Sequence, residues 1–156
     1  MPQTNNASAN TPIFVYGTLM AAPLLAWVLK GDSSKAIDVL SRRKPGTIFG
    51  FKRHRIHHCD YPALIRSNDT CAQVDGYIIF PATLSEWKKL DDFEGDSYER
   101  TPVIVRILDG SELDAFTYVW KGDADALADE DWSFEFFETE RLETWLELFG
   151  GMELVG

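Results

Sequence analysis

Two runs of alternating apolar residues, joined by an Asp-Gly pair, restrict the fold of this chain more than any other feature of its sequence. The first run covers residues 102–108 and the second covers residues 113–120. Asp109 and Gly110 stand between them, and this dipeptide between two alternating runs is typical of the tight turn of a β-hairpin. The sequence therefore predicts a pair of antiparallel strands in the second half of the chain.

The segments around this hairpin alternate between strand and helix signals. Further strands are expected over residues 12–16, 47–57 and 72–80, and helices over residues 24–30, 82–94 and 133–149. Gly50, inside the second of these strands, predicts a bulge. The order of strands, helix, hairpin and helix favours one α+β domain over residues 12–156. Its small mixed sheet should be curled or barrel-like and flanked by helices, rather than doubly wound.

Charge and composition argue against several classes of protein. The formal net charge of −10 repels the phosphates of nucleic acids, and the basic residues within 52–55 alternate between the two faces of a strand. No apolar run approaches the ~20 residues of a transmembrane helix, so no membrane partner is expected. Residues 1–11 are small and polar, unlike a signal peptide, and we expect a disordered tail there.

The cysteine content points to a reducing compartment. Cys59 and Cys71 are the two cysteines of the chain, too few for a disulfide framework. We therefore expect a cytoplasmic protein.

Residues 90–95, Leu-Asp-Asp-Phe-Glu-Gly, put a carboxylate where the last turn of a helix should carry a core residue. The helix is expected to begin with a capping box formed by Thr83 and Glu86. Glu94 lies seven positions after Trp87 and so falls on or beside the buried stripe. Burial and the negative end of the helix dipole both raise the pKa of a carboxyl group. Glu94 is the best candidate for proton exchange near neutral pH. The alternative is a boundary carboxylate whose charge extends into water.

The turn Tyr16, Gly17, Thr18 and Leu19 directly follows the first strand and is a second candidate. A strand that breaks at glycine can present successive backbone N–H groups to an anion, and glycine lets a ligand approach the backbone closely. Taken alone, the same pattern is more often an ordinary turn.

His54, His57, His58 and Cys59 have the residue types of a metal site or of a Cys–His nucleophile. On a strand, however, His54 and His58 would share one face while His57 and Cys59 share the other. Ligands cannot converge on one ion from two faces, and the sequence has no second His or Cys cluster to complete a zinc site. No metal site is expected.

Taken together, the turn at residues 16–19 and the Leu-Asp-x-Phe-Glu-Gly segment resemble the two-part signature of the gamma-glutamylcyclotransferase-like family. The match runs from Ile13 to Trp120 and also includes residues 61–63, 74–77 and 115–120. Thr18 and Leu19 make the turn more similar to the branch that acts on gamma-glutamyl amines than to the one that acts on gamma-glutamyl peptides.

The resemblance implies a small barrel flanked by helices, with a cavity between the turn and the glutamate. It also implies a small-molecule gamma-glutamyl substrate and release of 5-oxoproline without metal or cofactor. By position, Glu94 matches the family's acid/base glutamate, residues 16–19 match its substrate-binding turn, and Tyr98 matches its cavity tyrosine.

Two other functions stay open at this point. The same cavity could hold a small ligand without turnover, as a binding module. Alternatively, the aromatic face of the final helix could bind a protein partner, although such a helix more often packs on its own core. The sequence leaves the oligomeric state undetermined.

Overall fold

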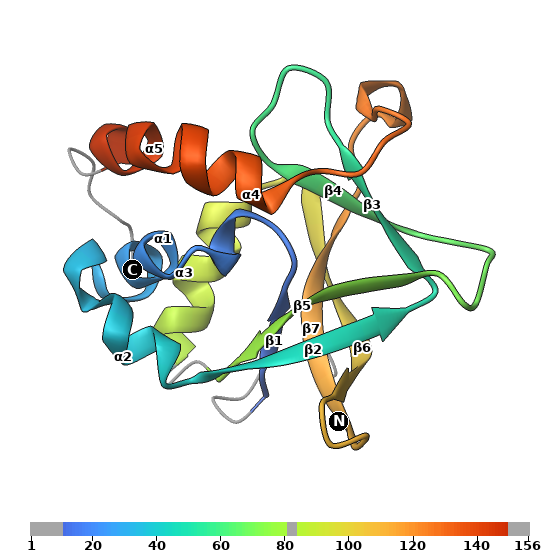
Figure 1. The fold of residues 1–156 in the computed structure, drawn as a ribbon, viewed down its shortest axis with the longest axis horizontal. Helices are drawn as coiled ribbons and strands as arrows, with labels where there is room; N and C mark the ends of the chain where they lie inside the picture. Colours follow the sequence, from blue (N-terminus) through green and yellow to red (C-terminus); the bar gives the residue numbers. More distant parts are fainter. Residues whose placement is uncertain (1–10, 81–83, 150–156) are drawn as a thin grey trace.

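The chain folds into a closed barrel with helices packed along one side (Figure 1). This computed structural model describes residues 11–80 and 84–149. The strands are β1 (Ile13–Val15), β2 (Arg43–Phe49), β3 (Phe51–Arg55), β4 (Pro62–Arg66), β5 (Gln73–Ile79), β6 (Tyr98–Ile107) and β7 (Glu112–Trp120). The helices are α1 (Ala22–Lys30), α2 (Ala36–Leu40), α3 (Leu84–Glu94), α4 (Phe134–Phe136) and α5 (Leu142–Phe149). Short 3-10 segments are η1 (Thr18–Met20), η2 (Ser33–Lys35) and η3 (Ala124–Ala126), and η4 (Phe137–Arg141) is π-helical.

The barrel has the strand order β1-β5-β2-β6-β7 and closes where β1 lies between β5 and β7. Ile13 pairs with Ile79 of β5 in an antiparallel ladder and with Phe116 of β7 in a parallel one. The predicted hairpin is confirmed as β6 and β7, and Gly110 in its turn has a φ of 88°. The predicted α+β fold with a barrel-like sheet is therefore confirmed.

The prediction of one strand over residues 47–57 was wrong. Gly50 has a φ of 81°, a left-handed conformation that ends the strand rather than producing a bulge within it. The chain before Gly50 belongs to the barrel as β2, whereas the chain after it pairs with β4 in a separate two-stranded sheet. The structure therefore adds β4, a strand that sequence periodicity did not reveal.

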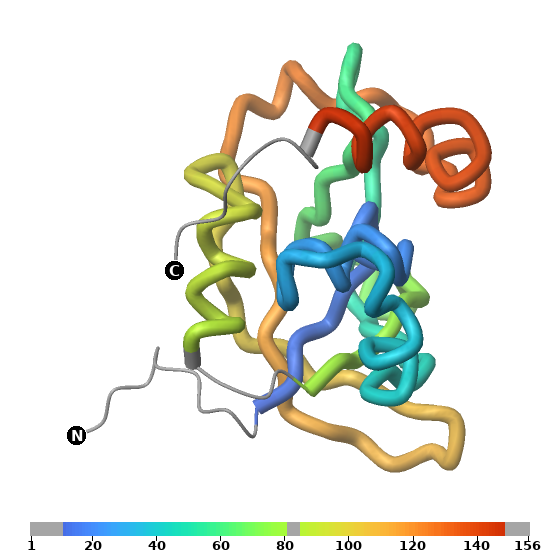
Figure 2. Tube along the Cα trace, turned by 90° about the vertical axis from the view of Figure 1, so that its left-hand side faces the viewer, coloured from blue at the N-terminus to red at the C-terminus, as the bar shows by residue number. Residues whose placement is uncertain are grey.

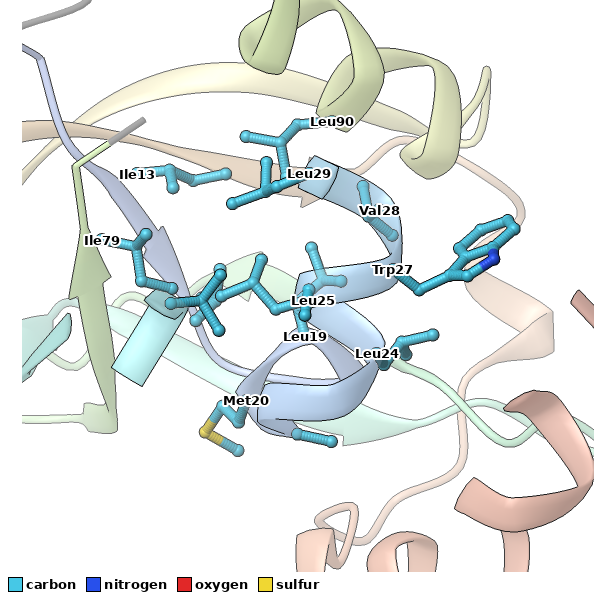
Figure 3. Packing of buried hydrophobic residues seen from close by; sticks show 14 of the residues in the cluster. Ile13, Leu19, Met20, Leu24, Leu25, Trp27, Val28, Leu29, Ile79 and Leu90 are labelled. Carbon is cyan, nitrogen blue, oxygen red and sulfur yellow. The ribbon is translucent and has the colours of Figure 1, made fainter. Parts of the chain in front are cut away.

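The main core lies between α1, α3 and the barrel. Leu24, Leu25 and Leu29 of α1 are fully buried, and Figure 3 shows Leu25 and Leu29 on the side of the helix that faces Ile13 and Ile79. The helix stops at Gly31, whose φ of 73° provides the left-handed C-cap expected after Lys30. Figure 2 shows α3 running alongside α1 on the same side of the barrel.

Glu86 anchors α3 to its neighbours. Its carboxylate is buried, accepts a hydrogen bond from Arg42 Nη1 at 2.8 Å and lies 3.7 Å from Lys30 Nζ. Thr83, its expected partner in the capping box, lies outside the described residues. Because this end of α3 is fixed by ion pairs, the other end, which carries Glu94, has a defined position against the barrel.

The segment predicted as a final helix consists of α4, η4 and α5, one after another. The disordered tail expected at residues 1–11 lies outside the described residues except for Thr11. Within the described ranges no helix combines the length and the apolar character that a membrane span requires.

Candidate active site

A pocket of about 450 Å³ opens between the end of β1, the end of α3, the start of β4 and α5. Its lining is mainly aromatic and apolar, and it includes every residue that the sequence singled out for a site. These are Tyr16, Gly17, Thr18, Leu19, Glu94 and Tyr98. The fold thus brings together two segments that lie more than seventy positions apart in the sequence.

Glu94 is the last residue of α3 and the ionisable carboxyl of greatest interest in the pocket. Gly95 follows with a φ of 75°, so the helix ends there and the Glu94 side chain is left at the pocket wall. Loss of hydration on burial, and secondly repulsion from the Asp91 carboxylate, raise the pKa of Glu94 to about 8. A group with this pKa exchanges protons in the neutral range.

Asp91 lies one helical turn before Glu94 and belongs to a polar network that includes Tyr118, a residue of the pocket lining. The hydroxyl of Tyr118 donates to Asp91 Oδ1 at 2.6 Å, and Arg100 Nη1 lies 3.3 Å from Asp91 Oδ2. Burial, followed by the hydrogen bond to Asp91, raises the pKa of Tyr118 above its usual range. Tyr118 therefore remains neutral, and its hydroxyl proton is engaged in the hydrogen bond to Asp91.

Tyr16 and Tyr98 flank the glutamate with hydroxyl groups that are already donating. The Tyr16 hydroxyl donates to the backbone carbonyl of Tyr118 and the Tyr98 hydroxyl donates to that of Pro62, both at 2.6 Å. Burial, and secondly the nearby Glu94, raise the pKa of both phenols. With their protons used in this way, the two oxygens are available to a ligand only as hydrogen-bond acceptors.

The turn at residues 17–19 forms part of the pocket wall. A Cβ atom at Gly17 would lie 2.8 Å from Cγ of Pro62, so glycine is required by the close approach of β4. Arg53 Nη1 donates to the carbonyl of Tyr16 at 2.8 Å and thereby fixes the start of the turn. As at the start of any helix, the first N–H groups of η1 have no acceptor within that short helix.

The histidine and cysteine cluster does not contribute to this pocket. His54 Nδ1 lies 3.0 Å from the carbonyl oxygen of Ala128, and His58 adopts a φ of 63° beyond the end of β3. The alternating arrangement expected for one continuous strand is therefore wrong from His57 onward. Across residues 11–80 and 84–149, no group of three or more His, Cys, Asp or Glu side chains is arranged to hold a metal ion.

Sequence reasoning missed several aromatic residues of the pocket. Trp27, Tyr61 and Trp145 line it in addition to Tyr118, and Figure 3 shows Trp27 on the side of α1 away from Ile13 and Ile79. Helical periodicity marks Trp145 as part of an apolar stripe. That stripe carries no signal to distinguish a pocket residue from a core residue.

Comparisons with known proteins agree with the two motifs. A family model described as gamma-glutamyl cyclotransferase, AIG2-like, matches residues 13–134. Protein AIG2 C of Arabidopsis thaliana is 28% identical over 152 residues, covering 97% of this chain and 82% of that protein. AIG2-like protein D of the same plant is 31% identical over 138 residues, covering 87% of this chain and 84% of that protein.

Solved structures give the same picture of the fold. A solution structure of an Arabidopsis thaliana protein is similar with a TM-score of 0.62 and 25% identity, covering 96% of this chain and 84% of that one. The crystal structure of an AIG2-like protein from Mus musculus has a TM-score of 0.52 at 21% identity, covering 79% and 87% respectively. The latter shares the fold.

The raised pKa of Glu94 predicts a particular dependence of stability on pH. Between the usual glutamate pKa of 4.5 and the folded-state value of about 8, the unfolded chain releases a proton that the folded chain keeps. The free energy of unfolding contributed by Glu94 must therefore fall as pH rises through this range and level off above it. Glu94→Gln removes the effect. Relative to the parent, we expect the variant to gain stability with pH, by at most about 1.4 kcal/mol per pH unit.

Urea denaturation of both proteins at several pH values between 5 and 9 measures this difference. Glu143→Gln, the same exchange at an exposed residue of α5, is the control for the chemistry of the substitution. A Glu94→Gln stability difference that does not change with pH would contradict the assignment of a raised pKa.

Proposed function

As its two sequence motifs predicted, the chain belongs to the gamma-glutamyl cyclotransferase, AIG2-like family, and we propose that it cyclises gamma-glutamyl amines or related gamma-glutamyl compounds. The products are 5-oxoproline and a free amine. The observation that carries this proposal is the carboxyl of Glu94, which is desolvated and lines the same pocket as the turn at residues 17–19.

The chemistry needs only one substrate molecule. Its α-nitrogen attacks its own γ-carbonyl carbon, a new C–N bond closes the five-membered lactam, and the C–N bond to the amine breaks. The two protons that the α-ammonium loses end on the departing amine, so the atoms of the substrate equal those of the two products. Because nucleophile and electrophile are tethered, the pocket has only to select the folded conformer of the substrate.

Glu94 is suited to move these protons. An α-ammonium group has a pKa near ~8, similar to the pKa of about 8 for Glu94 in the empty pocket. Proton transfer between two groups of matched pKa costs little free energy in either direction. Glu94 can therefore take a proton from the ammonium as general base and return it to the leaving amine as general acid. In this role it needs neither a metal nor a cofactor.

The remaining site residues would hold the substrate in place. The phenol oxygens of Tyr16 and Tyr98, which can only accept, fit the N–H donors of the α-amino group. The backbone N–H groups of Gly17, Thr18 and Leu19 fit an oxygen anion, either the α-carboxylate or the oxyanion that forms on the γ-carbonyl. Each role supports a bound gamma-glutamyl head group close to Glu94.

The turn should act through its backbone. Gly17→Val introduces a Cβ atom at a point 2.8 Å from Pro62, which displaces the turn from β4, and we expect substrate binding to be lost. Thr18→Ala keeps the N–H group and should raise KM only mildly. Near-UV circular dichroism checks that both variants are folded, and initial rates of 5-oxoproline release give KM. Equal and severe losses in both would identify the Thr18 hydroxyl, not the backbone, as the main contact.

Glu94→Gln tests the catalytic role itself. The amide keeps the shape of the side chain but cannot exchange a proton, so we expect the rate of 5-oxoproline release to fall at least ~100-fold. In the parent, kcat/KM should rise with pH along a limb well above the ~4.3 of a free glutamate, since the pKa of Glu94 is raised to about 8. The measurement is 5-oxoproline release by both proteins across pH. A rate of 5-oxoproline release by the variant within a few-fold of the parent's would exclude Glu94 as the proton carrier. If the parent releases no 5-oxoproline from any gamma-glutamyl compound, the pocket is that of a binding module.

A further inference from the structure

The mouth of the pocket has an aromatic wall that the proposed chemistry does not use. The rings of Tyr61 and Trp145 lie edge to face with centroids 6.2 Å apart, and both line the pocket. Tyr61 immediately precedes β4, whereas Trp145 belongs to α5, beyond the residues that the family model matches. The two rings together are called the aromatic wall below.

The position of Trp145 is fixed by Asp60. The indole Nε1 of Trp145 donates to Asp60 Oδ2 at 2.8 Å, and Arg141 Nε donates to the same oxygen at 3.0 Å. Trp145 also packs edge to face on the buried ring of Phe137 at 5.1 Å. Because the indole is oriented by hydrogen bonds and by packing, little conformational entropy is lost when a ligand contacts it.

The aromatic wall lies where the pocket is open to solvent. Leu19 and Tyr118 are 4% exposed, whereas Tyr61 is 38% exposed. The gamma-glutamyl head must reach Glu94 and the backbone of the turn for the reaction to occur. A group on the departing nitrogen that extends toward solvent on the side of Tyr61 meets the aromatic wall.

We propose that the aromatic wall makes this protein selective for gamma-glutamyl amides whose amine carries an aromatic ring. The inference rests on the proposed function and assigns Tyr61 and Trp145 as specificity-determining residues. An aromatic group on the substrate can stack against or meet the edge of the two rings, and it buries apolar surface that a short alkyl group leaves in water.

Gamma-glutamyl phenethylamide and gamma-glutamyl ethylamide form a matched pair of substrates, because both release a primary alkylamine. For the parent we expect kcat/KM to be about tenfold or more higher for the phenethylamide, mainly through KM. Trp145→Ala and Tyr61→Ala should each reduce this ratio to within about threefold. Phe136→Ala removes a ring that is 58% exposed on α4 and should keep the parent's ratio.

Calorimetric titration of the parent with both amides separates this inference from the proposed function. If the phenethylamide binds more tightly but neither compound yields 5-oxoproline, the proposed function fails and the selectivity stands. If both yield 5-oxoproline with equal KM, the selectivity is overturned and the function stands. If Trp145→Ala fails to fold, Tyr61→Ala is the deciding variant, because Tyr61 is the more exposed of the two residues. If its ratio of kcat/KM for the two amides equals that of the parent, the role of the aromatic wall is overturned.

Discussion

The short strand β1 determines how the barrel closes and where the pocket forms. Its three residues close the barrel by pairing with β5 on one side and β7 on the other. Thr117, fully buried in β7, donates its hydroxyl to the carbonyl of Phe14 at 2.9 Å, and Tyr16 donates to the carbonyl of Tyr118 at 2.6 Å. The turn at residues 17–19 follows directly from this closure. The barrel therefore determines where one wall of the pocket lies before any ligand binds.

The other wall of the pocket is formed by the end of α3, where the Glu94 carboxyl destabilises the folded state. A carboxyl group with its pKa raised to about 8 opposes folding whenever the medium would ionise it, and the Asp91 carboxylate one turn away adds to the cost. The buried ion pair of Glu86 and the packing of Leu90 hold the helix in place against this. A glutamate that destabilises the fold but faces a cavity is typical of a residue retained for its chemistry.

Much of this arrangement was predictable from local signals. The hairpin turn, the glycine that ends α1 and the helix ending at Glu94 each follow from a few adjacent residues. The division of residues 47–57 was not predictable, because a glycine in a strand allows either a bulge or a break. The pairing of the chain after Gly50 with β4, outside the barrel, produces a break. The aromatic wall was missed for a similar reason: the hydrogen bond that orients Trp145 is accepted by Asp60, 85 positions earlier in the chain, and helical periodicity does not reveal it.

The proposed chemistry depends on a Glu94 carboxyl that exchanges its proton near neutral pH inside the pocket. The most direct measurement is a titration of the glutamate side-chain carboxyl carbons by NMR, with Glu94→Gln to identify the resonance that disappears. The structure predicts that this one resonance titrates with a midpoint near 8, as burial and Asp91 require. A midpoint near 4.5, the ordinary glutamate value, would show that the carboxyl is hydrated and would contradict the account.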